Sequence, residues 1–325
     1  RRFEILWPVS VARFLQKKSI FVIYTEPAGS TPPAFMDKQM KNRRIRTAIL
    51  SLLWLAASCA AQQKPDEATL YVSIPPLKEV VGGIVGDDFR TEVLVPPGAS
   101  PETYEPTPRQ FIGLNRAQLI FNVGLLDFET ALLRKIDDRQ KIVNLSRGIE
   151  PIAGSCSHGD HGGHHTHGVD PHVWTSPRAL QRMAANAYEA IHARYPDSAK
   201  YTKNYESLQR RLQELDERTA ERIERSGTEY FIIYHPALTY YARDYGLRQE
   251  AIETDGKEPS ARHLSGIIRE ARAKGIRKIL YQSQFPASAV ETVARDIGAE
   301  AVRIDPLRED VTANIDEITE QLTSR

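Results

Sequence analysis

The sequence predicts an α/β protein of two lobes, each built around its own central sheet and joined by one long helix. Short apolar runs alternate with amphipathic stretches over residues 66–198, as strands separated by helices do. Residues 199–226 carry apolar side chains at steps of three and four and no helix breaker. The alternation then restarts over residues 227–325, so we expect an N-terminal lobe, a linking helix and a C-terminal lobe.

The N-terminal lobe is expected to hold four strands and three helices. The predicted strands are residues 69–74, 91–95, 117–123 and 141–146. The predicted helices are residues 77–85, 107–116 and 176–195, and Pro196 closes the last of them.

The linking helix is predicted from a single apolar stripe. Its members are Tyr201, Tyr205, Leu208, Leu212, Leu215, Thr219 and Ile223. At about 1.5 Å per residue such a helix is roughly 40 Å long, enough to bridge two lobes. Gly227 ends it, and the strands of the C-terminal lobe are predicted at residues 230–235, 248–253, 277–283 and 300–305.

The N-terminal region predicts export. Basic residues precede an apolar run at 48–57 that is too short to anchor the chain across a bilayer, so we expect a signal peptide at 36–58. The sequence Ala56-Ala57-Ser58-Cys59 resembles a lipobox, which predicts a lipid on Cys59 and a protein held at the periplasmic or cell-surface side of the membrane. The alternative is ordinary cleavage that leaves a protein without an anchor.

Residues 1–35 precede this signal and contain no methionine. We expect them to come from an over-extended start, with Met36 or Met40 as the native first residue. The formal net charge of +1 gives no global field that would attract nucleic acid, so no nucleic-acid partner is expected.

Candidate ligands stand where predicted strands end, which is where open α/β sheets bind their ligands. Glu102 follows strand 91–95, and His172 lies in "DPHVW". His235 ends one strand of the second lobe and Asp305 ends another. Two imidazoles and two carboxylates suit zinc, manganese or iron(II). Taken singly, each residue fits equally well as a hydrogen-bonded or turn residue, so the prediction rests on their joint placement.

A second group of histidines lies on a glycine-rich loop at 156–168. Its members are His158, His161, His164, His165 and His167. Imidazoles on such an adaptable backbone predict weak auxiliary metal binding, and the alternative is a solvated spacer. Cys156 beside them is expected to be an unpaired thiol if Cys59 carries lipid.

Together these motifs resemble the solute-binding component of bacterial metal-ion ABC transporters of the zinc/manganese group. The resemblance runs from about Leu70 to the C-terminus and rests on "VPPGASPETYEPTP", "DPHVWTSP", "YHPALTYYARDYGL", "DGKEPSARHL" and "IDPL". A histidine-rich loop before "DPHVW" is typical of the zinc-uptake branch.

The resemblance implies two lobes joined by a rigid helix, with one metal in the interlobe cleft held by Glu102, His172, His235 and Asp305. It implies a monomer that captures extracytoplasmic Zn²⁺ and delivers it to an ABC permease with its cytoplasmic ATPase. It implies no enzyme activity.

One position departs from the family, which usually has His where this chain has Glu102. An oxygen ligand there keeps Mn²⁺ or Fe²⁺ open beside zinc, and Glu105 or a loop histidine are alternatives for completing the site. The affinity order of divalent metals favours zinc. An exported zinc hydrolase with Glu105 as its base is the alternative from another class, although the chain has no H-E-x-x-H motif. A surface adhesin is a further alternative.

Overall fold

The computed structural model describes residues 68–153, 168–253, 259–285 and 287–324. The predicted signal peptide, the lipidation site Cys59, the over-extended start at 1–35, Cys156 and the histidines of 158–167 lie outside these ranges, so they stay predictions. Residues Lys64–Arg325 form one compact unit.

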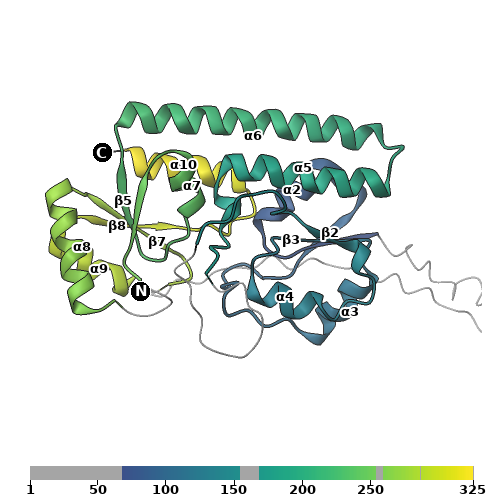
Figure 1. The fold of residues 1–325 in the computed structure, drawn as a ribbon, viewed down its shortest axis with the longest axis horizontal. Coiled ribbons are helices and arrows are strands. Elements are labelled where there is room, and N and C mark those ends of the chain that lie inside the picture. The colour runs from purple at the N-terminus through teal and green to yellow at the C-terminus, as the bar shows by residue number, and fades with distance from the viewer. Residues whose placement is uncertain (1–67, 154–167, 254–258, 286, 325) are drawn as a thin grey trace, which may run out of the picture. The chain divides into compact units, whose positions relative to one another are not determined.

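The N-terminal lobe has a four-stranded parallel sheet in the order β2-β1-β3-β4 (Figure 1). Its strands are β1 (Thr69–Val72), β2 (Arg90–Val93), β3 (Leu119–Asn122) and β4 (Ile142–Asn144). Parallel strands require crossover connections, and helices supply them here. These helices are α2 (Pro76–Val85), α3 (Pro108–Arg116) and α4 (Asp127–Leu133), and α5 (Pro177–Arg194) follows the last strand.

The C-terminal lobe repeats this topology in the order β6-β5-β7-β8, again parallel throughout. Its strands are β5 (Tyr230–Ile233), β6 (Arg248–Ala251), β7 (Lys278–Gln282) and β8 (Glu300–Ile304). Its helices are α7 (Thr239–Asp244), α8 (Ala261–Lys274), α9 (Ser288–Ile297) and α10 (Val311–Thr323). The two-lobed α/β fold predicted from the sequence is confirmed.

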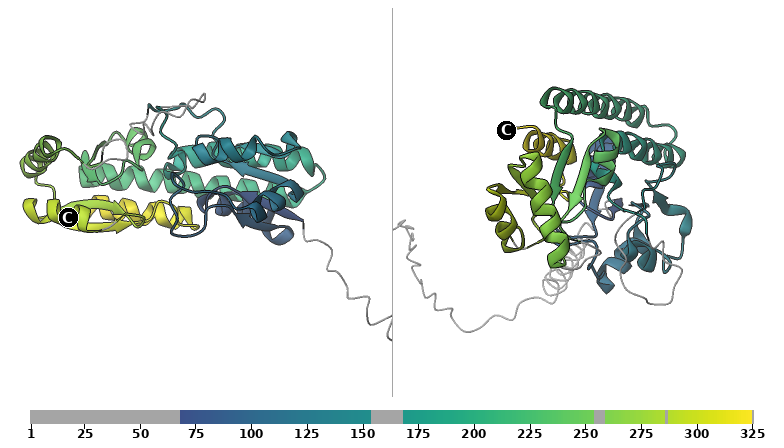
Figure 2. Two further views of the ribbon diagram at one scale, coloured as in Figure 1. Left: turned by 90° about the horizontal axis from the view of Figure 1, so that it is seen from below. Right: turned by 60° about the vertical axis from the view of Figure 1, so that its left-hand side comes forward.

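The predicted linking helix at 199–226 is α6 (Ala199–Ser226). It ends at Gly227, whose φ of 67° lies in the left-handed region that glycine adopts without strain. The buried side of α6 packs against α2 and α5 of the first lobe and α10 of the second. Figures 1 and 2 show it running along both lobes.

The lobes share one apolar core. A single cluster of buried side chains includes Leu70 of β1, Leu212 of α6, Leu280 of β7 and Ile315 of α10. A second, smaller cluster belongs to the C-terminal lobe alone, and its residues come from β5, β7, α8 and α9. Because separating the lobes would expose the shared core, this packing opposes hinge motion between them.

Polar contacts also cross between the lobes. The indole of Trp174 donates to the carbonyl of Pro306 at 2.9 Å. The Glu79 carboxylate of α2 accepts from both the backbone N–H and the hydroxyl of Thr312, in the first turn of α10. Within the described part of the chain, no helix is long and apolar enough to cross a membrane.

The shared core gives a test of cooperativity. Leu212 of α6 is fully buried in the shared core, so Leu212→Ala is expected to lower the free energy of unfolding by about 2–5 kcal/mol. The exposed neighbour Gln213→Ala is the matched control, with an expected change within about 0.5 kcal/mol. Urea unfolding of residues 64–325 should show one transition in both variants; separate transitions for the two lobes would contradict a shared core.

Candidate metal centre

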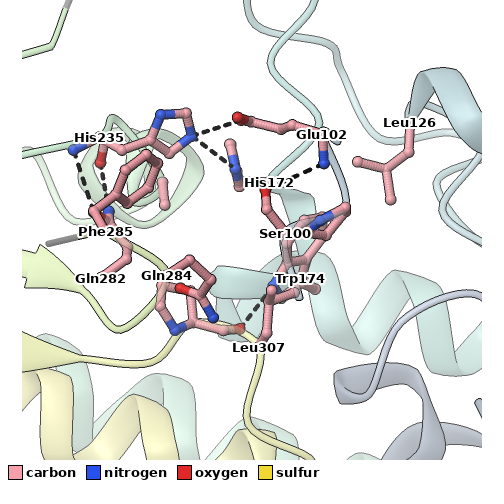
Figure 3. A pocket seen from close by; sticks show the side chains of 13 residues that line it. Ser100, Glu102, Leu126, His172, Trp174, His235, Gln282, Gln284, Phe285 and Leu307 are labelled. Atoms are coloured by element: carbon pink, nitrogen blue, oxygen red, sulfur yellow. Dashed lines mark hydrogen bonds and ion pairs between the residues drawn. The ribbon is translucent and has the colours of Figure 1, made fainter. Parts of the chain in front are cut away.

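Three side chains from three separate loops meet between the lobes (Figure 3). They are Glu102 after β2, His172 before α5 and His235 directly after β5. Their ligand atoms all lie within 4.8 Å of one another. The Nε2 atoms of His172 and His235 are 3.4 Å apart, and Glu102 Oε1 is 2.9 Å from Nε2 of His235. The sequence predicted this convergence, and the structure brings these three residues together.

His172 is held by its own loop. The Asp170 carboxylate accepts the backbone N–H of His172 at 2.8 Å, and the same oxygen lies 2.9 Å from the ring Nδ1. A short 3₁₀ helix, Val173–Thr175, follows at once and buries Trp174 beside the imidazole. With Nδ1 occupied by Asp170, the free nitrogen of the ring is Nε2, and it points toward His235.

His235 is fixed from the neighbouring strand β7. Gln282 accepts the backbone N–H of His235 and donates its amide to the backbone carbonyl of the same residue. The ring stacks on Phe285 with 5.4 Å between centroids. Its Nδ1 lies 3.2 Å from the Glu253 carboxylate, so its Nε2 faces Glu102 and His172.

Glu102 reaches the site from a loop over the cleft. Its backbone N–H donates to the Ser100 hydroxyl, and Pro101 between them is buried. The Glu102 side chain is 17% exposed, against 5% for His235, so it is the ligand nearest to solvent.

The cavity at the centre is small and largely apolar. Its volume is about 30 Å³, and its walls include Leu126, Trp174, Phe285 and Leu307. One water requires roughly 10–15 Å³ of such space, so the cavity holds an ion with one or two small ligands. The apolar walls limit the access of bulk water and strengthen the electrostatic interactions inside.

The charge balance raises the pKa of His235. Burial lowers this pKa, but hydrogen bonds and opposite charges from Glu102 and Glu253 outweigh burial and raise it to about 9. Around neutral pH, the imidazole of His235 therefore carries a proton between two carboxylates.

Asp305 does not join the three converging residues. Its Oδ1 accepts from the side-chain amide of Gln284 at 3.0 Å and from the backbone N–H of Leu307 at 3.1 Å. Those two contacts hold the carboxylate within the turn after β8, beside the cavity wall rather than among the ligand atoms. Glu105, the other acidic candidate, is exposed and is also outside the group.

Sequence reasoning missed the carboxylates that hold the rings. These carboxylates belong to Asp170 and Glu253, and the candidate ligands predicted from the sequence include neither residue. Glu253 follows β6 by two residues, and its contact with His235 depends on the register between β5 and β6.

The ligand atoms suit a tetrahedral ion. Two nitrogens bound to zinc at 2.0–2.1 Å in a tetrahedron lie about 3.3 Å apart, close to the 3.4 Å between the Nε2 atoms. Two imidazoles and one carboxylate leave a fourth position for a small ligand.

Comparison with protein families supports this chemistry. The family described as "Zinc-uptake complex component A periplasmic" matches residues 70–323. The high-affinity zinc uptake system protein ZnuA of Bacillus subtilis is 29% identical over 276 residues, covering 80% of this chain and 86% of that protein. The zinc-binding lipoprotein AdcA of Streptococcus pneumoniae is 27% identical over 281 residues, and the match spans 82% of this chain but only 56% of that relative.

Solved structures agree with the sequence matches. A crystal structure of ZnuA superposes with a TM-score of 0.72 at 30% identity, covering 79% of this chain and 98% of that chain. A ZnuA variant with residues 138–173 deleted and zinc bound superposes with a TM-score of 0.71 at 31% identity, over 80% of this chain and 99% of that one. The chain therefore belongs to the family of periplasmic zinc-uptake component A proteins.

Proposed function

We propose that this protein captures Zn²⁺ outside the cytoplasm and delivers it to an ABC permease for import. The observation that carries the proposal is the convergence of Glu102, His172 and His235 on one small cavity between the lobes. The permease, its ATPase and the metal are the partners that follow from family membership.

Zinc is favoured over manganese and iron(II) by the donor atoms. Nitrogen and oxygen donors bind zinc more tightly than either competitor. Two of the three donors are imidazole nitrogens, which suit zinc better than manganese, a cation that suits oxygen ligands. We propose the three converging residues as the tight site, with Asp305 remaining a predicted fourth ligand and the loop histidines at 158–167 remaining predicted auxiliary ligands.

The same cavity argues against an exported hydrolase. The donor set of two histidines and one glutamate also occurs in catalytic zinc sites, which need room for a substrate beside the metal-bound water. The space here suits an ion and a small ligand. Among the described residues, Glu105 is exposed and outside the group, so it is not placed to act as a general base.

Removal of either histidine tests the site. His172→Ala and His235→Ala are each expected to weaken zinc binding by more than about 100-fold, because each removes a direct ligand. His192→Ala is the matched control, since His192 is exposed on α5 and stacks on Tyr188. Chelator competition measures the affinities. Unchanged tight binding in both ligand variants would reject the site.

Zinc binding should release a proton at neutral pH. Because the pKa of His235 is raised to about 9, zinc must displace its proton, and this group makes zinc affinity rise about tenfold per pH unit up to about pH 9. The same shift stabilises the metal-free fold fully below about pH 6.5, and that contribution is lost as pH rises through about 9. Calorimetry in buffers of different ionisation heat measures the released protons; binding heats that do not depend on the buffer would contradict this account.

Competition between metal ions tests the predicted preference of the site for zinc. Wild-type protein is expected to bind zinc more tightly than manganese or iron(II). Glu102→His should widen the preference, because it replaces an oxygen donor by a nitrogen donor. A preference for zinc over manganese that is the same in Glu102→His and wild type would show that Glu102 is not a direct ligand.

A further inference from the structure

We propose that Glu253 is a positioning residue for the metal: it accepts the Nδ1–H of His235 and so directs the Nε2 lone pair of that ring at the ion. The inference rests on the proposed zinc site and deepens it, because it assigns a residue that does not touch the metal.

The position of Glu253 is fixed by the sheet. Its backbone N–H donates to the carbonyl of Tyr234 at 2.9 Å, which extends the pairing of β5 and β6 past the ends of both strands. That pairing sets Glu253 beside His235, the residue after Tyr234. The Glu253 side chain is 5% exposed, and its Oε2 lies 3.2 Å from Nδ1 of His235.

The chemistry of imidazole makes this contact decisive for ligation. A neutral imidazole carries one N–H, and the other nitrogen holds the lone pair that binds a metal. With the N–H on Nδ1 facing Glu253, the lone pair of His235 lies on Nε2, facing Glu102 and His172. A facing carboxylate also makes the imidazole a stronger donor.

The other ligand histidine has the same arrangement, produced by different means. Asp170 faces Nδ1 of His172 at 2.9 Å and is buried, as Glu253 is. Asp170 lies two residues before His172 in the same loop, whereas Glu253 reaches His235 from the end of the neighbouring strand β6. Since the local backbone differs, we attribute the shared geometry to what both rings must do, which is to present Nε2 to one ion.

Glu253 gives a cleaner test than Asp170. The Asp170 carboxylate also holds the backbone N–H of His172, so removing it disturbs the loop itself. Within the described residues, the Glu253 carboxylate makes its hydrogen bond to the His235 ring. A change at Glu253 therefore acts on the orientation and donor strength of that ring.

The experiment compares Glu253→Ala and Glu253→Gln with Glu250→Gln. Glu250 lies on the same strand, and its carboxylate contacts Arg248 instead of the site. Glu253→Ala is expected to weaken zinc binding by about 10–100-fold in chelator competition. Glu253→Gln keeps an acceptor without the charge and is expected to fall between Glu253→Ala and the wild type, while Glu250→Gln should match the wild type.

A second readout reports on the ring itself. Nitrogen-15 NMR of the zinc-loaded protein should show a proton on Nδ1 of both His172 and His235, with the His235 proton shifted far downfield by its carboxylate partner. Glu253→Ala should move the His235 proton upfield or lose it to exchange, and Glu253→Gln should move it partway. The His172 signal should stay in place in both, which a general loosening of the fold would not produce.

The outcomes separate this inference from the proposed function. If wild-type protein binds no zinc tightly, the proposed function fails. If wild-type protein binds tightly and His235→Ala abolishes binding, but Glu253→Ala keeps wild-type affinity and an unshifted His235 signal, only the role of Glu253 is overturned. If Glu253→Ala does not fold, a Glu253→Gln variant identical to wild type in both readouts overturns it equally.

Discussion

Both lobes bury their apolar faces in one continuous core, and the site depends on this constraint. His172 belongs to the first lobe and His235 to the second, so the 3.4 Å between their Nε2 atoms is set by how the lobes pack. Helix α6 runs along both lobes, and the hydrogen bond from Trp174 to Pro306 ties them together beside the cavity. The packing of the lobes therefore holds the ligand side chains in position before the ion binds, and binding requires little rearrangement of the protein.

The electrostatics follow from burying carboxylates around two imidazoles. Asp170, Glu102 and Glu253 place three acidic groups close to His172 and His235. Buried charges are costly unless they are paired. In the metal-free protein, the raised pKa of His235 keeps a proton on its ring, and this positive charge offsets the negative charge of the carboxylates. When a divalent cation binds, the charge of the cation takes the place of that proton. The acidic surroundings thus both hold the rings and favour a cation in the cavity.

Local patterns were enough to predict most of the fold. The apolar stripe of α6 depends only on spacing along the chain, and its predicted bounds match Ala199–Ser226. The predicted strands ran up to two residues too far at their carboxyl ends, as at 69–74 against Thr69–Val72. Backbone hydrogen bonds between neighbouring strands continue there, as from the N–H of Ser73 to the carbonyl of Phe121, and those extra residues lead into the loops of the site.

The sequence predicted the three residues that converge on the cavity, but not the residues that hold them in place. Three of the four predicted ligands converge, because the loops after β2, before α5 and after β5 meet between the lobes. Sequence does not reveal that Gln284 and the backbone of Leu307 take up the Asp305 carboxylate, because those contacts depend on the shape of a turn. The partnership of Glu253 with His235 depends on strand register, which no motif in the chain encodes.

X-ray absorption at the zinc edge of the protein loaded with one equivalent of zinc tests the central claim most directly. The account predicts a shell of nitrogen and oxygen at about 2.0–2.1 Å with the outer-shell scattering of two imidazoles per zinc. A sulfur neighbour at about 2.3 Å, or fewer than two imidazoles per zinc, would place the tightly bound zinc away from the cleft between His172 and His235 and would contradict the account.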